Sequence, residues 1–211
     1  MSGVGRILRS EACIAEGADW LAAREPRFAH ALTLTGPLPT RLRPDGFAAM
    51  LSAIVSQQLS VAAARTIWAR LEAMDAVTPE GCRALDDEAL RACGLSRPKI
   101  RYVRGLIDAA PDFDVLRGLP DAAVVAELTA LKGVGVWTAE IYAMFSLGRA
   151  DVFAPGDLAL QESARLLFDL PDRPGERALR EMAEAWSPWR AVAARLLWAY
   201  YHVEKSRDGI V

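Results

Sequence analysis

Apolar side chains recur at three- and four-residue steps along almost the whole chain, and strand-like alternation is nearly absent. This periodicity predicts an all-α fold built from about ten short helices. The expected helices span residues 11–23, 45–57, 60–73, 87–92, 97–109, 121–131, 137–147, 158–168, 175–185 and 189–204. Proline and glycine separate them, as at Pro79 with Gly81, Gly133 with Gly135, and Gly118 with Pro120.

The longest uncharged stretch, residues 46–64, has the length of a membrane span. Its centre carries Ser56, Gln57, Gln58 and Ser60, and a polar block is costly at the middle of a bilayer. We therefore expect two buried helices joined at the sequence SQQLS and no association with a membrane.

The composition is that of a globular chain, since 52% of the 211 residues are hydrophobic and 25% are charged. Three irregularly spaced cysteines form no metal or cluster motif, and the N-terminus lacks a secretory signal. We expect a cytoplasmic protein in a reducing compartment. The formal net charge of -2 argues against a broadly cationic surface for nucleic acid, although a local basic site remains compatible with it.

The segment LKGVGVWTAE, from Leu131 to Glu140, places two glycines between predicted helices and indicates a tight helical hairpin. Glycine permits a positive φ and a close approach of the backbone to another molecule. The start of the next helix presents N–H groups to an anion such as phosphate. Packing alone also explains glycines in a short helix connection, so both interpretations stay open.

Asp157 follows a Pro-Gly turn and begins an apolar helix. The position suits a helix N-cap, which is worth about 1 kcal/mol. No capping box is evident, because Leu160 stands where Glu or Gln would be needed. The alternative is a carboxylate held in a cleft, where it stabilises a developing cation or orients a water molecule.

Tryptophan and basic residues add two further candidates. Four of the six tryptophans follow the glycine turn, at Trp137, Trp186, Trp189 and Trp198. Most tryptophans lie in a core, but a pair beside a carboxylate can sandwich a flat base. The stretch from Arg91 to Gly105 carries five basic residues and no acidic one. It is either a solvated helix face or a surface that contacts phosphates.

Taken in order, these motifs resemble the helix-hairpin-helix (HhH-GPD) DNA glycosylase superfamily, most closely its bacterial DNA-3-methyladenine glycosylase II branch. The matching segments are IVSQQLSVAAA at 54–64, GLSRPKIRYVRGL at 94–106, LKGVGVWTAE at 131–140, PGD at 155–157 and WSPWRAVAARLLW at 186–198. The resemblance covers roughly residues 40–204. Each motif is modest alone, and their order and spacing make the combination specific.

The resemblance implies two helical lobes with a DNA-facing cleft between them. The central lobe is expected at 46–149 and contains the hairpin, while residues 1–45 and 150–211 form the second lobe. The implied enzyme flips an alkylated purine of the 3-methyladenine type out of double-stranded DNA and hydrolyses its N-glycosidic bond, which initiates base excision repair. Asp157 is the implied catalytic residue, and the implied base pocket contains Trp137, Trp198 and Tyr142.

The same resemblance implies a set of DNA contacts, at Gly133, Val134, Gly135, Val136, Thr138, Gln57, Gln58, Arg97 and Lys99. It also implies a structural Na+ or K+ on the main-chain carbonyls of Thr129, Leu131 and Val134. No lyase activity is expected, because Trp137 stands where lyase relatives have a nucleophilic lysine. The four-cysteine motif is missing, so we expect neither an iron-sulfur cluster nor a required cofactor.

Several departures from the family pattern leave the preferred lesion open. Ile141 and Leu158 stand where relatives can have aromatic pocket residues, and Gln58 stands where an apolar side chain can fill the gap left by the flipped base. The roughly 45 residues before the central lobe leave no room for the extra N-terminal domain of the bacterial branch.

Three alternative functions follow from these observations. The chain could be a related glycosylase for deaminated or oxidised bases, a non-catalytic helix-hairpin-helix DNA-binding module, or an unrelated helical protein with an ordinary glycine turn. As an alkylpurine glycosylase, the protein is expected to be a monomer of the bacterial cytoplasm, associated with the nucleoid.

Overall fold

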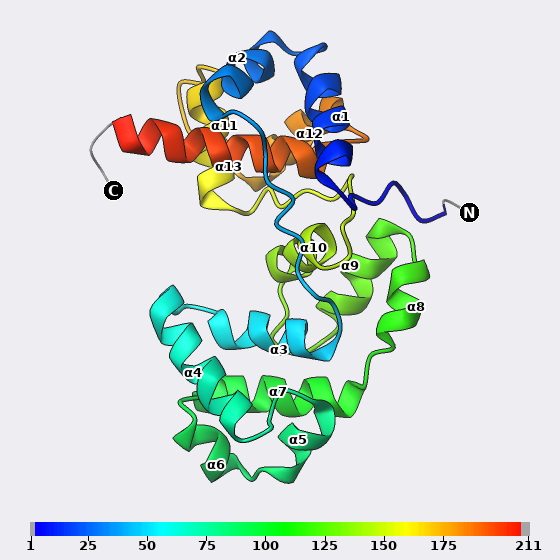
Figure 1. Cartoon of the computed structure of the whole chain (residues 1–211), viewed down its shortest axis with the longest axis vertical. Helices are drawn as coiled ribbons and strands as arrows, with labels where there is room; N and C mark the ends of the chain where they lie inside the picture. Colours follow the sequence, from blue (N-terminus) through cyan, green and yellow to red (C-terminus); the bar gives the residue numbers. More distant parts are fainter. Residues whose placement is uncertain (1–2, 208–211) are drawn as a thin grey trace. The chain divides into compact units, whose positions relative to one another are not determined.

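The computed structural model describes residues 3–207 (Figure 1). Within that range, the regular structure consists of α-helices, one short 3-10 helix and a single isolated bridge between Ile7 and Arg149. The predicted all-α fold is therefore confirmed. The chain divides into two compact units, Met1–Leu42 with Ala143–Val211, and Arg43–Tyr142.

The first unit combines both ends of the chain. Its helices are α1 (Glu11–Ala22), α2 (Pro26–Thr35), α11 (Leu158–Leu167), α12 (Glu176–Ala183) and α13 (Arg190–Arg207), with a 3-10 turn at Glu184–Trp186. Helix α13 packs against α1, α2 and α11 (Figure 1). Residues 191–197 of α13 are all buried, which explains why this segment is almost wholly apolar. Helix α13 is thus the central element of the first unit.

The second unit is built around α7. Its helices are α3 (Phe47–Ser56), α4 (Val61–Ala73), α5 (Pro79–Ala84), α6 (Asp87–Ala92), α7 (Arg97–Ala109), α8 (Phe113–Gly118), α9 (Asp121–Thr129) and most of α10 (Val136–Phe145). Helix α7 packs against α3, α5 and α6, and its apolar face is buried at Ile100, Val103, Leu106 and Ile107. That spacing is the helical periodicity on which the prediction of α7 rested.

The division between the units differs from the predicted lobes. The predicted central lobe runs to residue 149, whereas the second unit ends at Tyr142, inside α10. Main-chain hydrogen bonds explain the difference. The Leu8 N–H group donates to the Gly148 carbonyl at 2.7 Å, and the Ala150 N–H group donates to the Arg6 carbonyl at 3.0 Å. This pairing ties the segment after α10 to the N-terminal segment of the first unit.

The uncharged stretch at 46–64 folds into two helices, α3 and α4, as predicted. The buried side chains of α3 are Met50, Leu51, Ile54 and Val55. Across residues 3–207, no helix combines the length and the apolar character that crossing a membrane requires.

The periodicity does not predict the short helices α2, α5 and α8. In α2 and α5 the first helical residue is a proline, which suits that position because no intrahelical N–H bond is needed there. The Thr78 side chain caps α5 by accepting a bond from the Gly81 N–H group at 3.1 Å. Pro79 and Gly81, which we interpreted as helix breakers, therefore lie inside a helix, and that interpretation was wrong.

Candidate functional site

Asp157 is the N-cap residue of α11, as the turn before it predicts. Its backbone is extended, with φ -75° and ψ 121°. Its Oδ1 atom accepts hydrogen bonds from the backbone N–H groups of Ala159 at 2.9 Å and Leu160 at 3.0 Å. The first turn of a helix leaves such N–H groups without intrahelical partners. The cap thus holds the carboxylate at the positive end of the helix dipole.

A third N–H group reaches the same oxygen from α13. The Trp198 Nε1–H group donates to Asp157 Oδ1 at 3.2 Å. Both side chains are partly exposed, and the neighbouring Leu158 is 62% exposed. Hydrogen bonds from several N–H groups orient a carboxylate and stabilise its negative charge. Helices α11 and α13 therefore present an oriented anionic group that a ligand can approach beside an indole ring.

The four tryptophans after the glycine turn fall into two groups. Trp186 and Trp189 are core residues, 5% and 2% exposed, and the Trp186 ring packs edge-on against the Phe28 ring at 5.3 Å. Trp198 is partly exposed beside Asp157, and Trp137 of α10 is 46% exposed. The two tryptophans assigned to the base pocket are thus the two whose side chains reach the surface. Their contact with a base stays a prediction.

Two residues behind Trp198 were missed by sequence reasoning. The Phe145 ring centroid lies 5.6 Å from that of Trp198, and the Arg195 guanidinium lies 4.6 Å from the Phe145 centroid. Arg195 is only 4% exposed. One signal could have found it, because a lone cation within the otherwise apolar run 191–198 of a helix indicates a buried charge with specific contacts.

The predicted hairpin joins α9 to α10 through residues 130–135, and its two glycines serve different purposes. Gly133 has a φ of +87°, and a Cβ atom there would lie 2.2 Å from the Tyr102 ring of α7. A Cβ atom added at Gly135 would have no neighbour within 4 Å, and the residue is exposed. Gly133 therefore allows the turn to pack against α7, while Gly135 leaves the backbone open at the start of α10.

The other predicted hairpin contacts differ in exposure. Val136 is 46% exposed, whereas Val134 and Thr138 are 5% and 7% exposed and help to bury the turn. Within the hairpin, the surface available to a phosphate is thus at Gly135 and Val136, where the N–H groups of a helix start suit an anion.

The carbonyl groups predicted to hold a monovalent cation surround the end of α9. Thr129 is the last residue of α9, and the final carbonyls of a helix lack intrahelical N–H partners. The Leu131 carbonyl accepts a bond from the Val134 N–H group at 3.0 Å, and a carbonyl oxygen keeps a second lone pair. Neutral carbonyl oxygens are a donor set that fits Na+ or K+.

The connection between α3 and α4 places its two glutamines differently. The Gln57 Nε2 group donates to the Gly133 carbonyl at 2.8 Å, so this side chain fastens the connection to the hairpin. Gln58 is exposed and has a φ of +56°, which is uncommon for a residue with a side chain. Such backbone strain is found preferentially at functional sites. Gln58 is the exposed one of the two, and its contact with a duplex stays a prediction.

Lys99, a predicted phosphate contact, also has a partner inside the second unit. Its Nζ group donates to the Val55 carbonyl at 2.7 Å, close to the end of α3. Burial lowers the pKa of Lys99 from its ordinary value. This geometry gives Lys99 a structural role at the end of α3, and its contact with DNA stays a prediction.

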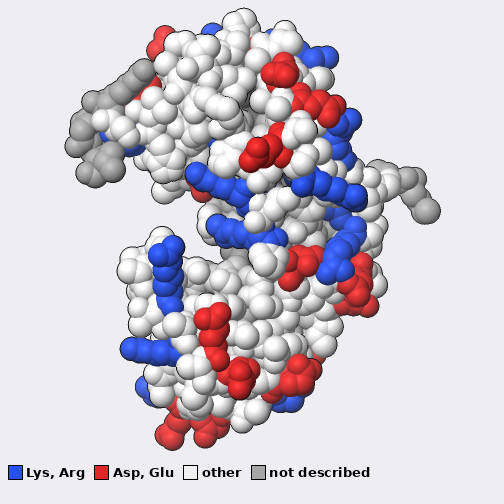
Figure 2. Space-filling model, in the orientation of Figure 1, with Lys and Arg blue, Asp and Glu red and all other residues white. Residues whose placement is uncertain are grey.

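The remaining basic residues of the 91–105 stretch are either bound to backbone carbonyls, as Lys99 is, or exposed. Arg104 donates to the Cys82 carbonyl at 2.8 Å and to the Leu85 carbonyl at 2.6 Å. The exposed ones, whose side chains form no ion pair or hydrogen bond within residues 3–207, are Arg91, Arg97 and Arg101. On the face drawn in Figure 2, Lys and Arg share the surface with Asp and Glu, and much of that face carries neither.

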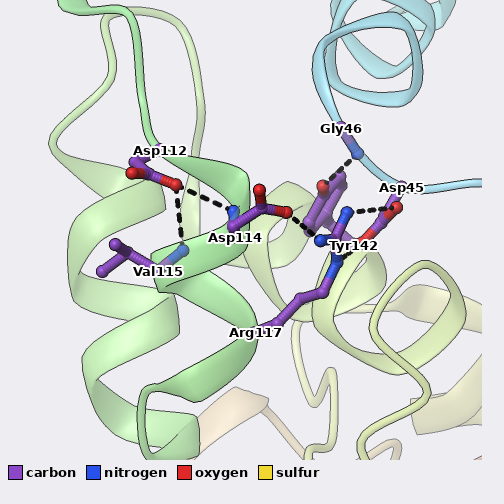
Figure 3. Close-up of polar contacts among 7 residues, drawn as sticks. All are labelled: Asp45, Gly46, Asp112, Asp114, Val115, Arg117 and Tyr142. Atoms are coloured by element: carbon purple, nitrogen blue, oxygen red, sulfur yellow. Dashed lines mark hydrogen bonds and ion pairs between the residues drawn. The ribbon is translucent and has the colours of Figure 1, made fainter.

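Tyr142, the third predicted pocket residue, lies in a polar cluster of the second unit (Figure 3). Its hydroxyl accepts a hydrogen bond from the Gly46 N–H group at 2.7 Å, and the residue is 3% exposed. Burial raises the pKa of Tyr142 to about 12. In the same cluster Arg117 pairs with Asp45 and Asp114. This geometry gives Tyr142 a structural role at the start of α3 and lends no support to its assignment to the base pocket.

Known proteins share the sequence and the fold of this chain. A relative from Schizosaccharomyces pombe, DNA-3-methyladenine glycosylase 1, is 32% identical over 74% of this chain and 72% of its own length. The crystal structure of DNA-3-methyladenine glycosidase from Bacillus halodurans has a TM-score of 0.83 and 33% identity, and the match covers 95% of this chain and 94% of that one.

The glycosylase of S. pombe has also been solved with nucleic acid. The S. pombe 3-methyladenine DNA glycosylase Mag1, in complex with abasic DNA, has a TM-score of 0.75 and 30% identity, with 87% of this chain and 95% of that one covered. The sequence model described as HhH-GPD superfamily base excision DNA repair protein matches residues 51–189, a range that includes the hairpin and Asp157. The resemblance inferred from the motifs is confirmed, and this chain belongs to the HhH-GPD superfamily of base excision DNA repair proteins.

Proposed function

We propose that this chain is a DNA glycosylase that removes alkylated purines of the 3-methyladenine type from double-stranded DNA. The observation that carries the proposal is the Asp157 carboxylate, which three N–H groups orient beside the partly exposed Trp198. The relatives named above support the choice of substrate, because both are named as 3-methyladenine enzymes. Base removal would initiate base excision repair.

The proposed reaction hydrolyses the bond between the sugar C1′ atom and a ring nitrogen of the base. The target nucleotide must first leave the base stack, which costs least for a poorly paired, damaged base. As the bond breaks, its electron pair leaves with the base and positive charge develops on the sugar. The Asp157 carboxylate stabilises that charge electrostatically. Water then adds to C1′ and releases a proton.

One carboxylate suffices for this substrate class. Most glycosidases need a second carboxyl group that protonates the leaving group. A purine alkylated at N3 or N7 already carries a positive charge, so it departs as a neutral base without an added proton. The aromatic face of Trp198 favours a cationic base next to the carboxylate. Trp137 is the second aromatic side chain that we propose to contact the base.

We propose that the N–H groups at Gly135 and Val136 bind the DNA backbone, with further contacts from Gln58 and Arg97. The carbonyls of Thr129, Leu131 and Val134 would hold Na+ or K+, and the ion would add positive charge near a phosphate. The proposed enzyme needs no other cofactor and acts as a monomer in the cytoplasm.

The proposed enzyme has no lyase activity. A lyase needs an amine that forms a Schiff base with the sugar, and Trp137 carries an indole where lyase relatives have a lysine. Lys132 is exposed on the hairpin turn and does not match that position. Borohydride added during turnover of alkylated DNA should therefore trap no covalent complex between enzyme and DNA.

A lesion panel tests the proposed function. Alkylated duplex DNA is assayed for release of 3-methyladenine and 7-methylguanine, in parallel with duplexes that contain 1,N6-ethenoadenine, hypoxanthine, uracil or 8-oxoguanine. We expect release of the alkylated purines. Excision of only a deaminated or oxidised base would indicate the related glycosylase. DNA binding without release of any base would indicate a non-catalytic module, and no binding of DNA even at low salt would overturn the proposed function.

A further inference from the structure

We infer that Arg195 is a positioning residue, which holds the Asp157 carboxylate in place through Phe145 and Trp198. The inference rests on the proposed function for its kinetic consequence. The structural claim, that Arg195 positions the Trp198 indole, does not depend on that function. Arg195, Phe145, Trp198 and Asp157 all belong to the first unit.

The Arg195 charge is buried, since the residue is only 4% exposed. Burial lowers the pKa of Arg195 to about 10, with the positive charge of Arg41 as a smaller cause, so the guanidinium is still charged at neutral pH. No acidic side chain within residues 3–207 forms a salt bridge with it. A buried charge without a counter-ion is costly, and an apolar residue of similar volume often stabilises a protein more. The contacts of Arg195 should therefore show what the charge does.

Arg195 contacts backbone carbonyl groups and the Phe145 ring. The Nη1 group donates to the Ala191 carbonyl at 2.9 Å, while Nη2 donates to the Thr40 and Met144 carbonyls at 3.3 Å each. They fix the guanidinium between α13, the end of α10 and the segment that follows α2. The guanidinium carbon then lies 4.6 Å from the Phe145 ring centroid, where a cation is attracted to an aromatic face.

The Phe145 ring in turn supports the indole of Trp198. The two ring centroids are 5.6 Å apart, with the planes tilted by 35°. Trp198 comes three residues after Arg195 on α13, so the two side chains lie on one face of the helix and both contact Phe145. The hydrogen bond from Trp198 Nε1 to Asp157 Oδ1 measures 3.2 Å, at the long end of the normal range. A small shift of the indole would therefore break it.

Three variants test this arrangement. Arg195→Met keeps much of the side-chain length but removes the charge and the donors. Arg195→Lys keeps the charge without the planar donor group. The matched control is Phe28→Leu, because Phe28 is fully buried in the same unit and packs on Phe168 and Trp186. It thus perturbs the core of the unit at a different aromatic cluster.

The structural readout is the indole N–H resonance of Trp198, which is identified by its absence from the spectrum of Trp198→Phe. We expect Arg195→Met to move this resonance toward its position in Asp157→Ala, where the acceptor is missing. Phe28→Leu should leave it in place at a comparable loss of melting temperature. An unmoved resonance in Arg195→Met, or an equal movement in Phe28→Leu, would overturn the inference.

The kinetic readout is single-turnover release of 7-methylguanine at a temperature where every variant is folded. We expect Arg195→Met to slow release by about 10- to 100-fold with unchanged affinity for alkylated duplex, since displacement of a catalytic group lowers the rate of the chemical step. Arg195→Lys should recover part of the rate. If Arg195→Met does not fold, Phe145→Leu interrupts the same set of contacts and should show the same two effects.

Unchanged release by the folded variants would overturn the inference and leave the proposed function standing. If the wild-type protein releases no alkylated base, the proposed function fails instead. The resonance of Trp198 still decides in that case whether Arg195 positions the indole.

Discussion

One oxygen of Asp157 receives N–H bonds from two helices, and this arrangement lets two roles of the residue be separated. The bonds from Ala159 and Leu160 cap α11, and an asparagine oxygen could accept them equally well. The bond from Trp198 orients the carboxylate without contributing to the cap. Only the stabilisation of a developing cation requires the negative charge. The oxygen of Asp157 therefore stabilises the start of α11, whereas its negative charge is what the proposed reaction requires.

We expect Trp198→Phe to slow base release by about tenfold, because the substitution removes one hydrogen bond to the Asp157 carboxylate and keeps an aromatic ring. Single-turnover release of 7-methylguanine by the folded variant checks this effect. An equal rate for Trp198→Phe and the wild-type protein would show that the indole N–H group has no part in the reaction.

Sequence reasoning could identify the candidate site only where a motif marks it. Asp157 follows a Pro-Gly turn, and Trp198 ends the matching segment at 186–198, so both could be selected before the structure was known. Phe145 lies in no matching segment, and its role depends on contacts with Arg195 and Trp198, which are distant in the sequence. The hydroxyl of Tyr142 is bonded to Gly46, a residue 96 positions away, and no local pattern predicts such a pair.

In the hairpin between α9 and α10, one glycine should matter for stability and the other for DNA binding. We expect Gly133→Ala to destabilise the protein by about 3 kcal/mol, since it adds a Cβ atom against the Tyr102 ring in a left-handed conformation. The methyl group added by Gly135→Ala would have no neighbour within 4 Å, so this substitution should leave the free energy of unfolding nearly unchanged. It should nonetheless weaken DNA binding, because its methyl group would keep a phosphate away from the backbone.

Thermal melting and DNA-binding titrations of the two variants check this prediction, and Gly118→Ala provides a control at a glycine that also faces open space, away from the hairpin. A Gly135→Ala protein with wild-type affinity would limit the role of the glycines to packing. A Gly133→Ala protein with wild-type stability would show that the turn adapts to a side chain.

Helices with a clear apolar repeat were predictable, whereas α2, α5 and α8 were not. Length alone did not decide this, because the six-residue helix α6 was predicted at 87–92. Helices such as α7 repeat their apolar positions over several turns, so periodicity alone finds them. Helix α5 has six residues, begins with a proline and contains a glycine, so its sequence is typical of a loop. It exists because Thr78 caps it and because its own residue Cys82 is fully buried, and both conditions depend on the surrounding chain.

Over the whole molecule, a net charge of -2 is compatible with DNA binding if few phosphates are contacted. Lys99 and Arg104 are bound to carbonyls of the second unit. The basic side chains that remain exposed in the 91–105 stretch are Arg91, Arg97 and Arg101. Specificity would then come from the pocket, and the mild overall acidity would limit nonspecific binding.

This distribution predicts a shallow dependence of DNA affinity on salt. Each phosphate contact contributes about -0.9 to the slope of the logarithm of affinity against the logarithm of salt concentration. Arg97→Ala should therefore reduce the magnitude of the slope by about 1. The matched control is Arg177→Ala, which removes the same charge from a side chain of α12 that is 93% exposed. Equal slopes for the two variants would remove Arg97 from the interface.

Single-turnover assays of Asp157→Asn on alkylated duplex DNA show whether the negative charge of Asp157 drives base release. Asparagine preserves the cap of α11, so the melting temperature and the affinity for the duplex should match those of the wild-type protein. We expect release of 3-methyladenine and 7-methylguanine to fall by at least about 100-fold, the scale on which loss of an electrostatic stabiliser acts. Release at the wild-type rate would show that the charge is not needed.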